Sequence, residues 1–334
     1  KRDNMNFLNF NVKRSNLLKF LTPTSKNTKW FESAPENKIS SRVVGRFLLQ
    51  FHQVANEIKN EKKESGLKFL DIGTGNGILP ELISAIFSCK SSVGLDPFSD
   101  GEHVTSHPRN TRSKLMKEIN KYFKKGSLDF SDYNQLLEFE SFSKIPSKII
   151  FSKPNKKWKF EKKFINQLST KKKFNFIFAK CIDHVPNWKT LFKNVTTRSE
   201  KNCTLLIKHN SFFSYNGAHR YGSTFIPWGH VLLSENNYKS YAKKFHPSRY
   251  KDMINFYYKG LAYPRYTLDE LKIILFKNNW KILSIEFAPN KKITEMLSLA
   301  GGAEKLLARA KKRYKNISLS ELISNRITIK AKKI

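Results

Sequence analysis

The order of apolar and polar residues along the chain predicts alternating helices and short buried strands. Apolar side chains recur every three or four positions from 39 to 58, the spacing of an amphipathic helix, and Gly66 follows the charged run that ends it. The next segments, LKFLDIG, ILPELISAIF and SSVGLDP, predict a buried strand, a helix and a second strand. A strand, a turn, a helix and a strand in this order begin a doubly wound parallel sheet.

The same alternation continues to the end of the chain. We expect further strands at 147–152, 173–180, 203–210, 280–288 and 326–334. We expect further helices at 111–125, 131–142, 157–169, 187–199, 267–279 and 303–316. Thr267 and Glu270 have the spacing of a capping box, which marks the start of one of these helices. The basic helix at 303–316 has an apolar side and is expected to pack on the domain, with contact to anionic lipid or nucleic acid as the alternative.

These elements predict one α/β domain with additions at two places. We assign residues 1–62 to an N-terminal helical cap and residues 63–334 to the main domain. Within that domain, 211–265 reads as an insertion after the fifth strand, because its first part is rich in histidine and aromatic residues without a sustained period. Trp30 and Phe31 in the cap either pack on the core or help to cover a ligand.

The composition leaves two explanations open for the strongly positive net charge of the chain. The 334 residues are 39% hydrophobic and 13% aromatic, which is enough for a sizeable core and argues against global disorder. Lys and Arg number 62 against 27 Asp and Glu, a net charge of +35. Such a charge suits a phosphate-rich partner or an anionic membrane surface. The scattered lysines, together with abundant Asn, Ile and Phe, equally suit the codon bias of an AT-rich genome.

The cysteines and the hydropathy indicate a cytoplasmic protein without a membrane span. Cys89, Cys181 and Cys203 are far apart and form no CxxC pair, which disfavours a zinc ribbon or a disulfide framework and suits a reducing compartment. No apolar run approaches the length of about 20 residues that a membrane helix needs. The visible start shows no signal-peptide pattern, although the chain begins at Lys1 and not at Met.

A glycine-rich turn follows the first predicted strand. Its pattern is Asp71-x-Gly73-x-Gly75-x-Gly77, with single-residue gaps. A dinucleotide-binding turn has the pattern Gly-x-Gly-x-x-Gly, and a P-loop needs Gly-Lys-Ser/Thr, so the turn is neither. Glycines lack Cβ atoms and let the backbone approach a bound molecule closely, at the start of a helix whose free N–H groups can receive a carboxylate.

The segment FLDIGTGNG resembles motif I of the class I S-adenosylmethionine-dependent methyltransferases. A second acid, Asp96, stands 19 residues after Gly77, where that family places the carboxylate that holds the ribose hydroxyls. The resemblance covers roughly 67–210 and extends to 334. It implies a Rossmann-like sheet of seven mostly parallel strands and S-adenosylmethionine as the cofactor. The cofactor-binding residues that it implies are Asp71, Gly73, Thr74, Gly75, Asn76, Gly77, Asp96, Pro97 and Asp183.

The resemblance also suggests where the methyl acceptor lies. After the strand at 173–180, CIDHVPNW is similar to the segment that small-molecule methyltransferases place beside the methyl group, which puts Asp183 and His184 there. His184 is the first candidate for the catalytic base, since histidine titrates near neutral pH. The other candidate bases are His209, His219 and His230, and the candidate substrate-binding residues are Tyr215, Tyr221 and Trp228. Structural packing of these histidines and aromatic residues is the alternative.

Several absent motifs narrow the chemistry. The Asn/Asp-Pro-Pro-aromatic signature of nucleic-acid base methylation is missing. The Pro-Cys pair of such enzymes is missing too, because Cys181 follows Lys180 and not a proline. We expect no metal, since no candidate pair has compact His-x-x-x-His spacing, and His103 and His107 belong to a segment interrupted by Pro108.

The sequence therefore predicts methyl transfer to an oxygen or nitrogen atom, assisted by histidine, on a small or medium-sized metabolite, sugar or lipid headgroup. RNA methylation through the basic surface is the enzymatic alternative. An inactive binding module of the same fold is the alternative of another class. The oligomeric state is not indicated.

Overall fold

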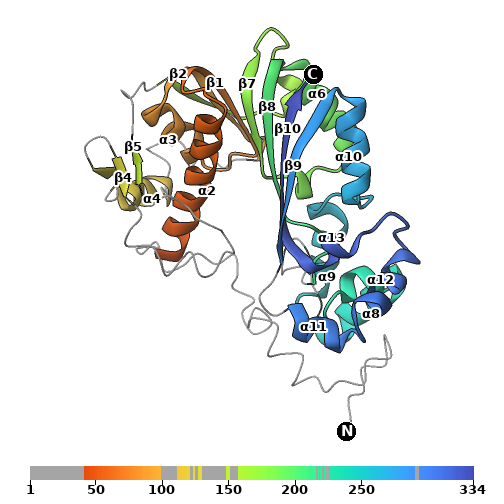
Figure 1. Cartoon of the computed structure of the whole chain (residues 1–334). Coiled ribbons are helices and arrows are strands. Elements are labelled where there is room, and N and C mark those ends of the chain that lie inside the picture. Colours follow the sequence, from red (N-terminus) through yellow and green to blue (C-terminus); the bar gives the residue numbers. More distant parts are fainter. Residues whose placement is uncertain are drawn as a thin grey trace.

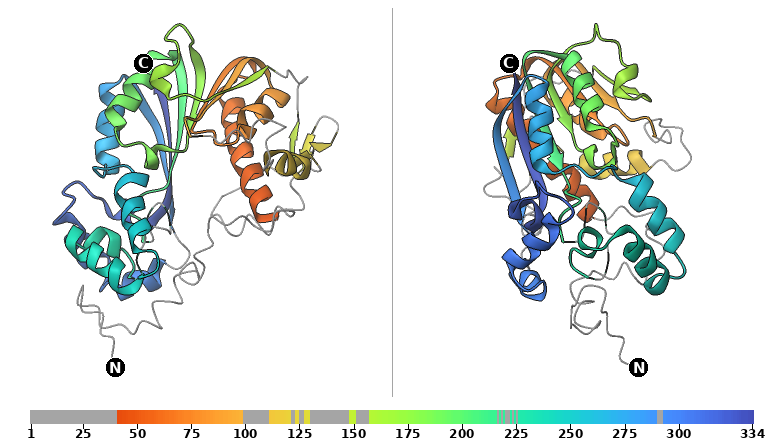
Figure 2. Two further views of the ribbon diagram at one scale, coloured as in Figure 1. Left: turned by 180° about the vertical axis from the view of Figure 1, so that it is seen from behind. Right: turned by 90° about the vertical axis from the view of Figure 1, so that its right-hand side faces the viewer.

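The computed structural model describes residues 41–98, 111–120, 123–124, 127–129, 148–150, 157–215, 217, 219, 222, 224, 226–289 and 293–334. A central sheet carries helices on both faces, and a separate group of helices lies beyond one end of its strands (Figures 1 and 2). None of the helices in these ranges has the length and apolar character needed to cross a membrane. The predictions for Trp30 and Phe31, for 131–142, and for His103 and His107 fall outside the described residues.

The central sheet has seven strands in the order β6-β2-β1-β7-β8-β10-β9, which confirms the predicted seven-stranded α/β fold. Strands β6, β2, β1, β7 and β8 are mutually parallel, while β10 runs antiparallel to both β8 and β9. The strand bounds are β1 Ser65–Ile72, β2 Ser88–Leu95, β6 Trp158–Glu161, β7 Phe174–Ala179, β8 Ser199–His209, β9 Trp280–Pro289 and β10 Ser324–Lys333. The order reverses between β1 and β7, and in such sheets ligands bind beyond the carboxyl ends of the strands at this point.

Apolar stripes on the helices pack against both faces of the sheet and form the main core. On one face lie α2 Ser41–Asn60, α3 Ile78–Ile86 and α4 Thr111–Asn120 (Figure 1). On the other lie α6 Trp188–Thr197 and α10 Leu268–Lys277. The capping box is confirmed at the start of α10, where Thr267 and Glu270 hydrogen bond to each other's backbone N–H. The central sheet and its two helical layers thus leave the carboxyl ends of the parallel strands free to carry a site.

A second core lies beyond the carboxyl ends of β8 and its neighbours. It combines residues from 212–261 with residues from 293–322, two segments separated by α10 and β9 (Figure 2). Its helices are α7 Gly229–Leu232, α8 Glu235–Phe245, α9 Tyr250–Asn255, the π-helix η6 Phe256–Gly260, α11 Ile293–Leu299, α12 Ala303–Lys311 and α13 Leu319–Ile323. The basic helix predicted at 303–316 supplies α12, and its apolar side is buried here through Leu306 and Ala310.

One predicted element is wrong, and another is a strand of a different sheet. The strand expected at 147–152 contributes β5 Lys148–Ile150 to a small separate sheet with β3 Phe123–Lys124 and β4 Ser127–Asp129. The edge strand of the main sheet is β6, inside the segment predicted as a helix at 157–169, of which only Ile165–Gln167 is a 3-10 turn. Trp158 and Phe160 alternate with charged residues, which is a strand period, and both rings lie about Gly77. The helix expected at 111–125 ends at Asn120.

Candidate active site

The glycine turn has three left-handed positions at alternate residues. Gly73, Gly75 and Gly77 have φ values of 74°, 61° and 72°, which other residues adopt at a cost. A Cβ atom on Gly73 would lie 2.4 Å from Cys181 Sγ, so the turn is packed against the end of β7. A Cβ atom on Gly75 would meet no atom within 4 Å. The turn is therefore tight at its first glycine and open at its second.

Backbone hydrogen bonds join this turn to the end of β2. The N–H groups of Gly73 and Thr74 both donate to Leu95 O, at 2.8 and 3.0 Å. Asp96 follows Leu95, and its Oδ2 accepts a hydrogen bond from Gly75 N at 2.9 Å. Its Oδ1 accepts from Phe98 N at 2.9 Å. The second acid of the sequence motif is thus held beside the glycines by the pairing of β1 with β2.

Asp71 is a buried carboxyl group at the end of β1. Only 2% of the residue is exposed. Burial raises its pKa to about 7, while the Thr74 side chain and the charge of Lys180 act in the opposite direction. Charge of either sign at this position is costly without a partner, so a cationic ligand group nearby would favour the ionised form.

The remaining residues of the cofactor motif cap α3 and end β2. Asn76 Oδ1 accepts a hydrogen bond from Ile78 N at 3.3 Å, at the first residue of the helix. The backbone oxygen of Asn76 accepts from Arg112 Nε at 2.9 Å, and Arg112 pairs with Glu81. Pro97 directly follows Asp96. The structure thus brings together the motif residues of β1 and β2 that sequence analysis implied.

Asp183, His184 and His219 form a cluster after the end of β7. Asp183 is 5% exposed, and its Oδ2 lies 3.1 Å from His219 Nε2 and 3.7 Å from His184 Nε2. Burial alone would raise the pKa of Asp183, but the hydrogen bond from His219 and the charges of the neighbouring histidines outweigh it and lower that pKa. The ring centroids of His184 and His219 are 4.6 Å apart. A buried carboxylate thus faces one exposed and one half-buried imidazole, two residues beyond Cys181, which packs against the glycine turn.

The hydrogen bonds determine the orientation of both imidazoles. His184 Nδ1 lies 2.5 Å from Gly260 O, and a carbonyl can only accept, so Nδ1 carries the proton and Nε2 keeps its lone pair. His219 Nε2 faces the ionised carboxylate of Asp183 and donates to it. His184 is therefore arranged to accept a proton at Nε2, and the imidazolium that forms would lie against Asp183.

The other two predicted bases are fully buried. His209 and His230 are 3% and 1% exposed, and burial lowers the pKa of each to about 4. The ring of His209 lies edge-on to Trp188, at 5.3 Å. His230 Nε2 hydrogen bonds to Phe212 O at 2.8 Å inside the second core. Both stay neutral at physiological pH, and their surroundings favour a packing role.

Two of the predicted substrate-binding residues also lie in the second core. Tyr215 is 7% exposed and Trp228 is completely buried, with its Nε1 donating to Leu322 O at 2.8 Å. Their ring centroids are 6.4 Å apart. Tyr221 is outside the described residues. Substrate contact by these three side chains stays a prediction.

The acid–histidine cluster also has the composition of a metal site. One ligand atom each from Asp183, His184 and His219 lie within 4.8 Å of one another. Two imidazoles and a carboxylate suit several divalent transition metals. Because His184 and His219 are 35 positions apart, no compact sequence spacing could show this group. The prediction that the protein uses no metal stays a prediction.

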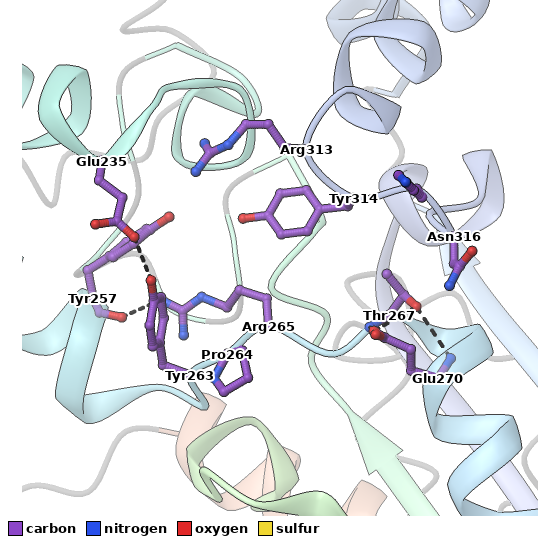
Figure 3. Close-up of a pocket in the computed structure, with 11 residues that line it drawn as sticks. Glu235, Tyr257, Tyr263, Pro264, Arg265, Thr267, Glu270, Arg313, Tyr314 and Asn316 are labelled. Atoms are coloured by element: carbon purple, nitrogen blue, oxygen red, sulfur yellow. Dashed lines mark hydrogen bonds between the residues drawn. The ribbon is translucent and has the colours of Figure 1, made fainter.

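Three further residues near this cluster were not predicted from the sequence: Gly260, Ala262 and Arg265. Gly260 orients His184 through its backbone oxygen, and Ala262 N donates to Asp183 O at 2.7 Å. Arg265 lines both a small cavity beside Asp183 and His209 and a larger pocket of about 460 Å³. The larger pocket lies between the second core and the start of α10 (Figure 3). The only sequence signal is the aromatic run FYYKGLAYPRY at 256–266, which carries this arginine.

Comparison with known proteins agrees with this architecture. A family model described as a methyltransferase domain matches residues 42–285. No curated protein matches the sequence. Among solved structures, the magnesium protoporphyrin IX methyltransferase of Synechocystis PCC 6803 with bound SAH is 10% identical over 96% of this chain and 99% of its own, with a TM-score of 0.43. A putative sarcosine dimethylglycine methyltransferase from Galdieria sulphuraria is 13% identical over 85% and 84%, with a TM-score of 0.40.

The matched region contains the glycine turn, both acids and the acid–histidine cluster. The chain therefore belongs to the methyltransferase domain family, and its strand order is that of the class I fold. It is an S-adenosylmethionine-dependent methyltransferase.

Proposed function

We propose that the protein methylates an oxygen or nitrogen atom of a small-molecule acceptor, with His184 as the base. The observation that carries this proposal is the Asp183–His184–His219 cluster beside the glycine turn. The cluster unites a buried carboxylate with an imidazole whose Nε2 is free to accept a proton. The pocket of about 460 Å³ at Arg265 has the size of a small-molecule site, which suits a compact acceptor better than a nucleic-acid strand.

The residues of the glycine turn fit S-adenosylmethionine, which supplies an electrophilic methyl group when bound. The open side of Gly75 leaves room for the cofactor against the backbone. The N-terminus of α3 would receive its carboxylate and Asp71 its ammonium group. Asp96 would accept hydrogen bonds from the ribose hydroxyls, in exchange for its contact with Gly75 N.

The three residues of the cluster then divide the proton transfer among them. His219 donates to Asp183 and holds that carboxylate in place. The hydrogen bond to Gly260 O keeps the lone pair of His184 on Nε2. His184 Nε2 would remove the proton of the acceptor atom, and Asp183 would stabilise the resulting imidazolium. Such general-base assistance contributes roughly 10²–10⁴-fold to a rate.

The test is a screen for SAH formation with hydroxyl- and amine-bearing small molecules, with RNA tested in parallel. Once an acceptor is found, we expect His184→Ala to lower kcat by about 10²-fold or more, because the base is lost. Added imidazole should restore part of the rate. Calorimetry should show unchanged SAH affinity, since no described contact joins His184 to the glycine turn.

His209→Asn provides a control within the same region. His209 is neutral and buried, so the folded His209→Asn variant should keep the pH dependence of kcat. In His184→Ala, kcat should no longer fall at acidic pH, because the base that is protonated there is absent. Turnover of RNA with no small molecule accepted would contradict the small-molecule assignment. An unchanged kcat in His184→Ala would contradict the role of His184.

A further inference from the structure

The larger pocket contains a buried arginine whose charge has no acidic partner among the residues that the structure describes. Arg265 is 9% exposed. Its terminal nitrogens donate to the backbone oxygens of Ala262 and Tyr257. Its Nε is buried and has no hydrogen-bond partner in the part of the chain that the structure describes. A guanidinium has five N–H donors, so these two bonds leave most of them unused.

Aromatic rings hold this guanidinium in place. Its central carbon lies 4.2 Å from the ring centroid of Phe212, 4.6 Å from that of Tyr257 and 5.3 Å from that of Tyr263. Cation–π contacts of this kind stabilise a cation but do not neutralise its charge. Buried charges in folded proteins are normally paired, so Arg265 is both rigid and ready for an anion.

A second arginine reaches the same pocket from the opposite side. Arg313, just beyond α12, extends toward the space that Arg265 borders, and Tyr314 lies between the two (Figure 3). Arg313 donates to the backbone oxygens of Val231 and Leu233. Among the described residues it forms no ion pair either. Lys315 adds a third cation to the lining.

The two acids in the lining are engaged by other donors. Glu235 Oε1 accepts a hydrogen bond from the Tyr263 hydroxyl at 2.5 Å. Glu270 Oε2 accepts from the backbone N–H and the hydroxyl of Thr267 in the capping box. The pocket therefore combines three cations with two acids whose oxygens face hydroxyl and backbone donors. The balance favours an oxyanion as the ligand.

We propose that this pocket binds the carboxylate or phosphate group of the methyl acceptor, so that the substrate is an acidic small molecule. Arg265 connects the pocket with the active site, because it also lines the small cavity beside Asp183 and His209. A guanidinium presents its N–H groups as a planar fork that matches both carboxylate and phosphate. The claim that the bound anion belongs to the methyl acceptor rests on the proposed function, whereas binding of the anion does not require turnover.

The experiment measures binding of phenyl phosphate and benzoate to the full chain by calorimetry, with benzyl alcohol as the neutral analogue. We expect saturable binding of at least one anion and no saturable binding of benzyl alcohol. The preferred anion distinguishes a phosphate-bearing from a carboxylate-bearing acceptor. Equal affinity for benzyl alcohol, or no saturable binding of either anion, would overturn the inference.

A set of matched variants tests the residues. Arg265→Lys keeps the charge but loses the fork, and Arg313→Gln removes a charge, so each should weaken binding by about ten-fold or more. Lys315→Gln and Lys312→Gln change the same charge on neighbouring exposed residues, but only Lys315 lines the pocket. We expect Lys315→Gln to lose affinity for the anion and Lys312→Gln to keep the wild-type affinity. A loss of affinity in Lys312→Gln as large as that in Arg313→Gln would show a nonspecific charge effect and contradict the site.

SAH binding in the same samples separates the two proposals. Arg313→Gln should retain wild-type SAH affinity, which also shows that the variant is folded. If every accepted substrate proves uncharged and Arg313→Gln leaves its KM unchanged, the anion site is wrong and the methyltransferase proposal stands. If anions bind as described but the screen finds no small-molecule acceptor, the proposed function fails and the anion site stands.

Discussion

At the scale of single residues, the first two glycines of the motif have different functions. Gly73 faces Cys181 with no room for a side chain, whereas Gly75 faces open space. Both have positive φ, so each requires glycine for its backbone. The first glycine thus serves packing within the protein, and the second leaves room for a ligand.

This difference predicts different consequences for two alanine substitutions. Gly73→Ala should lower the free energy of unfolding by about 3 kcal/mol or more, because a clash adds to backbone strain. Gly75→Ala should cost only about 1–2 kcal/mol, from strain alone, but should weaken SAH binding at least as strongly. Urea unfolding and SAH calorimetry on both variants provide the measurements. Equal losses of stability would contradict this assignment.

At the scale of elements, α10 is positioned by its first residues. Thr267 and Glu270 cap the helix reciprocally, and both oxygens of the buried Glu321 carboxyl lie within 3.1 Å of Leu268 N. Glu321 belongs to α13, so this contact joins the second core to a helix that covers the main sheet. The start of α10 therefore fixes one wall of the pocket at Arg265.

Loss of this cap should lower stability without affecting the glycine turn. Thr267→Ala removes a hydroxyl that accepts from Glu270 N, and we expect a loss of about 1 kcal/mol in the free energy of unfolding. Thr267→Ser keeps the hydroxyl and should lose much less. Thermal unfolding of the two variants measures this difference, and SAH affinity should stay unchanged in both. A Thr267→Ser variant as unstable as Thr267→Ala would argue against the cap.

At the scale of the whole molecule, two sets of buried titratable groups change the stability with pH in opposite directions. Burial lowers the pKa of His209 and His230 to about 4, so the unfolded chain binds more protons between about pH 4 and 6.5 and stability rises with pH there. Burial raises the pKa of Asp71 to about 7 and that of Glu321 to about 8. For these acids the folded chain binds more protons, so stability falls as pH rises above their unfolded values.

The two effects should nearly cancel below about pH 6.5 and leave a fall in stability above it. We expect the free energy of unfolding to decrease between pH 6.5 and 8, with about 1–2 kcal/mol of the decrease due to Glu321. Glu321→Gln should flatten this part of the profile, measured by urea unfolding at each pH. A Glu321→Gln profile as steep as that of the wild type would show that this carboxyl is not protonated in the folded protein at neutral pH.

The sequence by itself predicted the α/β sheet except for one edge strand, and the family resemblance of its glycine motif implied the methyl donor. Hydrophobic periodicity, the glycine spacing and Asp96 are local patterns, and parallel strand pairing places the ends of adjacent strands together. One assignment failed where the signal was short: β6 has four residues, and the alternation of Trp158 and Phe160 was too brief to outweigh a helical reading. Local patterns of this length do not decide which strand joins an edge.

Only the tertiary structure decided which histidines face the acid and where an anion could bind. His209, His219 and His230 were all candidate bases behind His184, but burial removes His209 and His230, and His219 reaches Asp183 across 36 positions. The pocket at Arg265 combines residues from 235 to 316 that belong to no common motif. Burial and contacts between distant segments arise from packing of the whole chain, so these properties were not accessible from the sequence pattern.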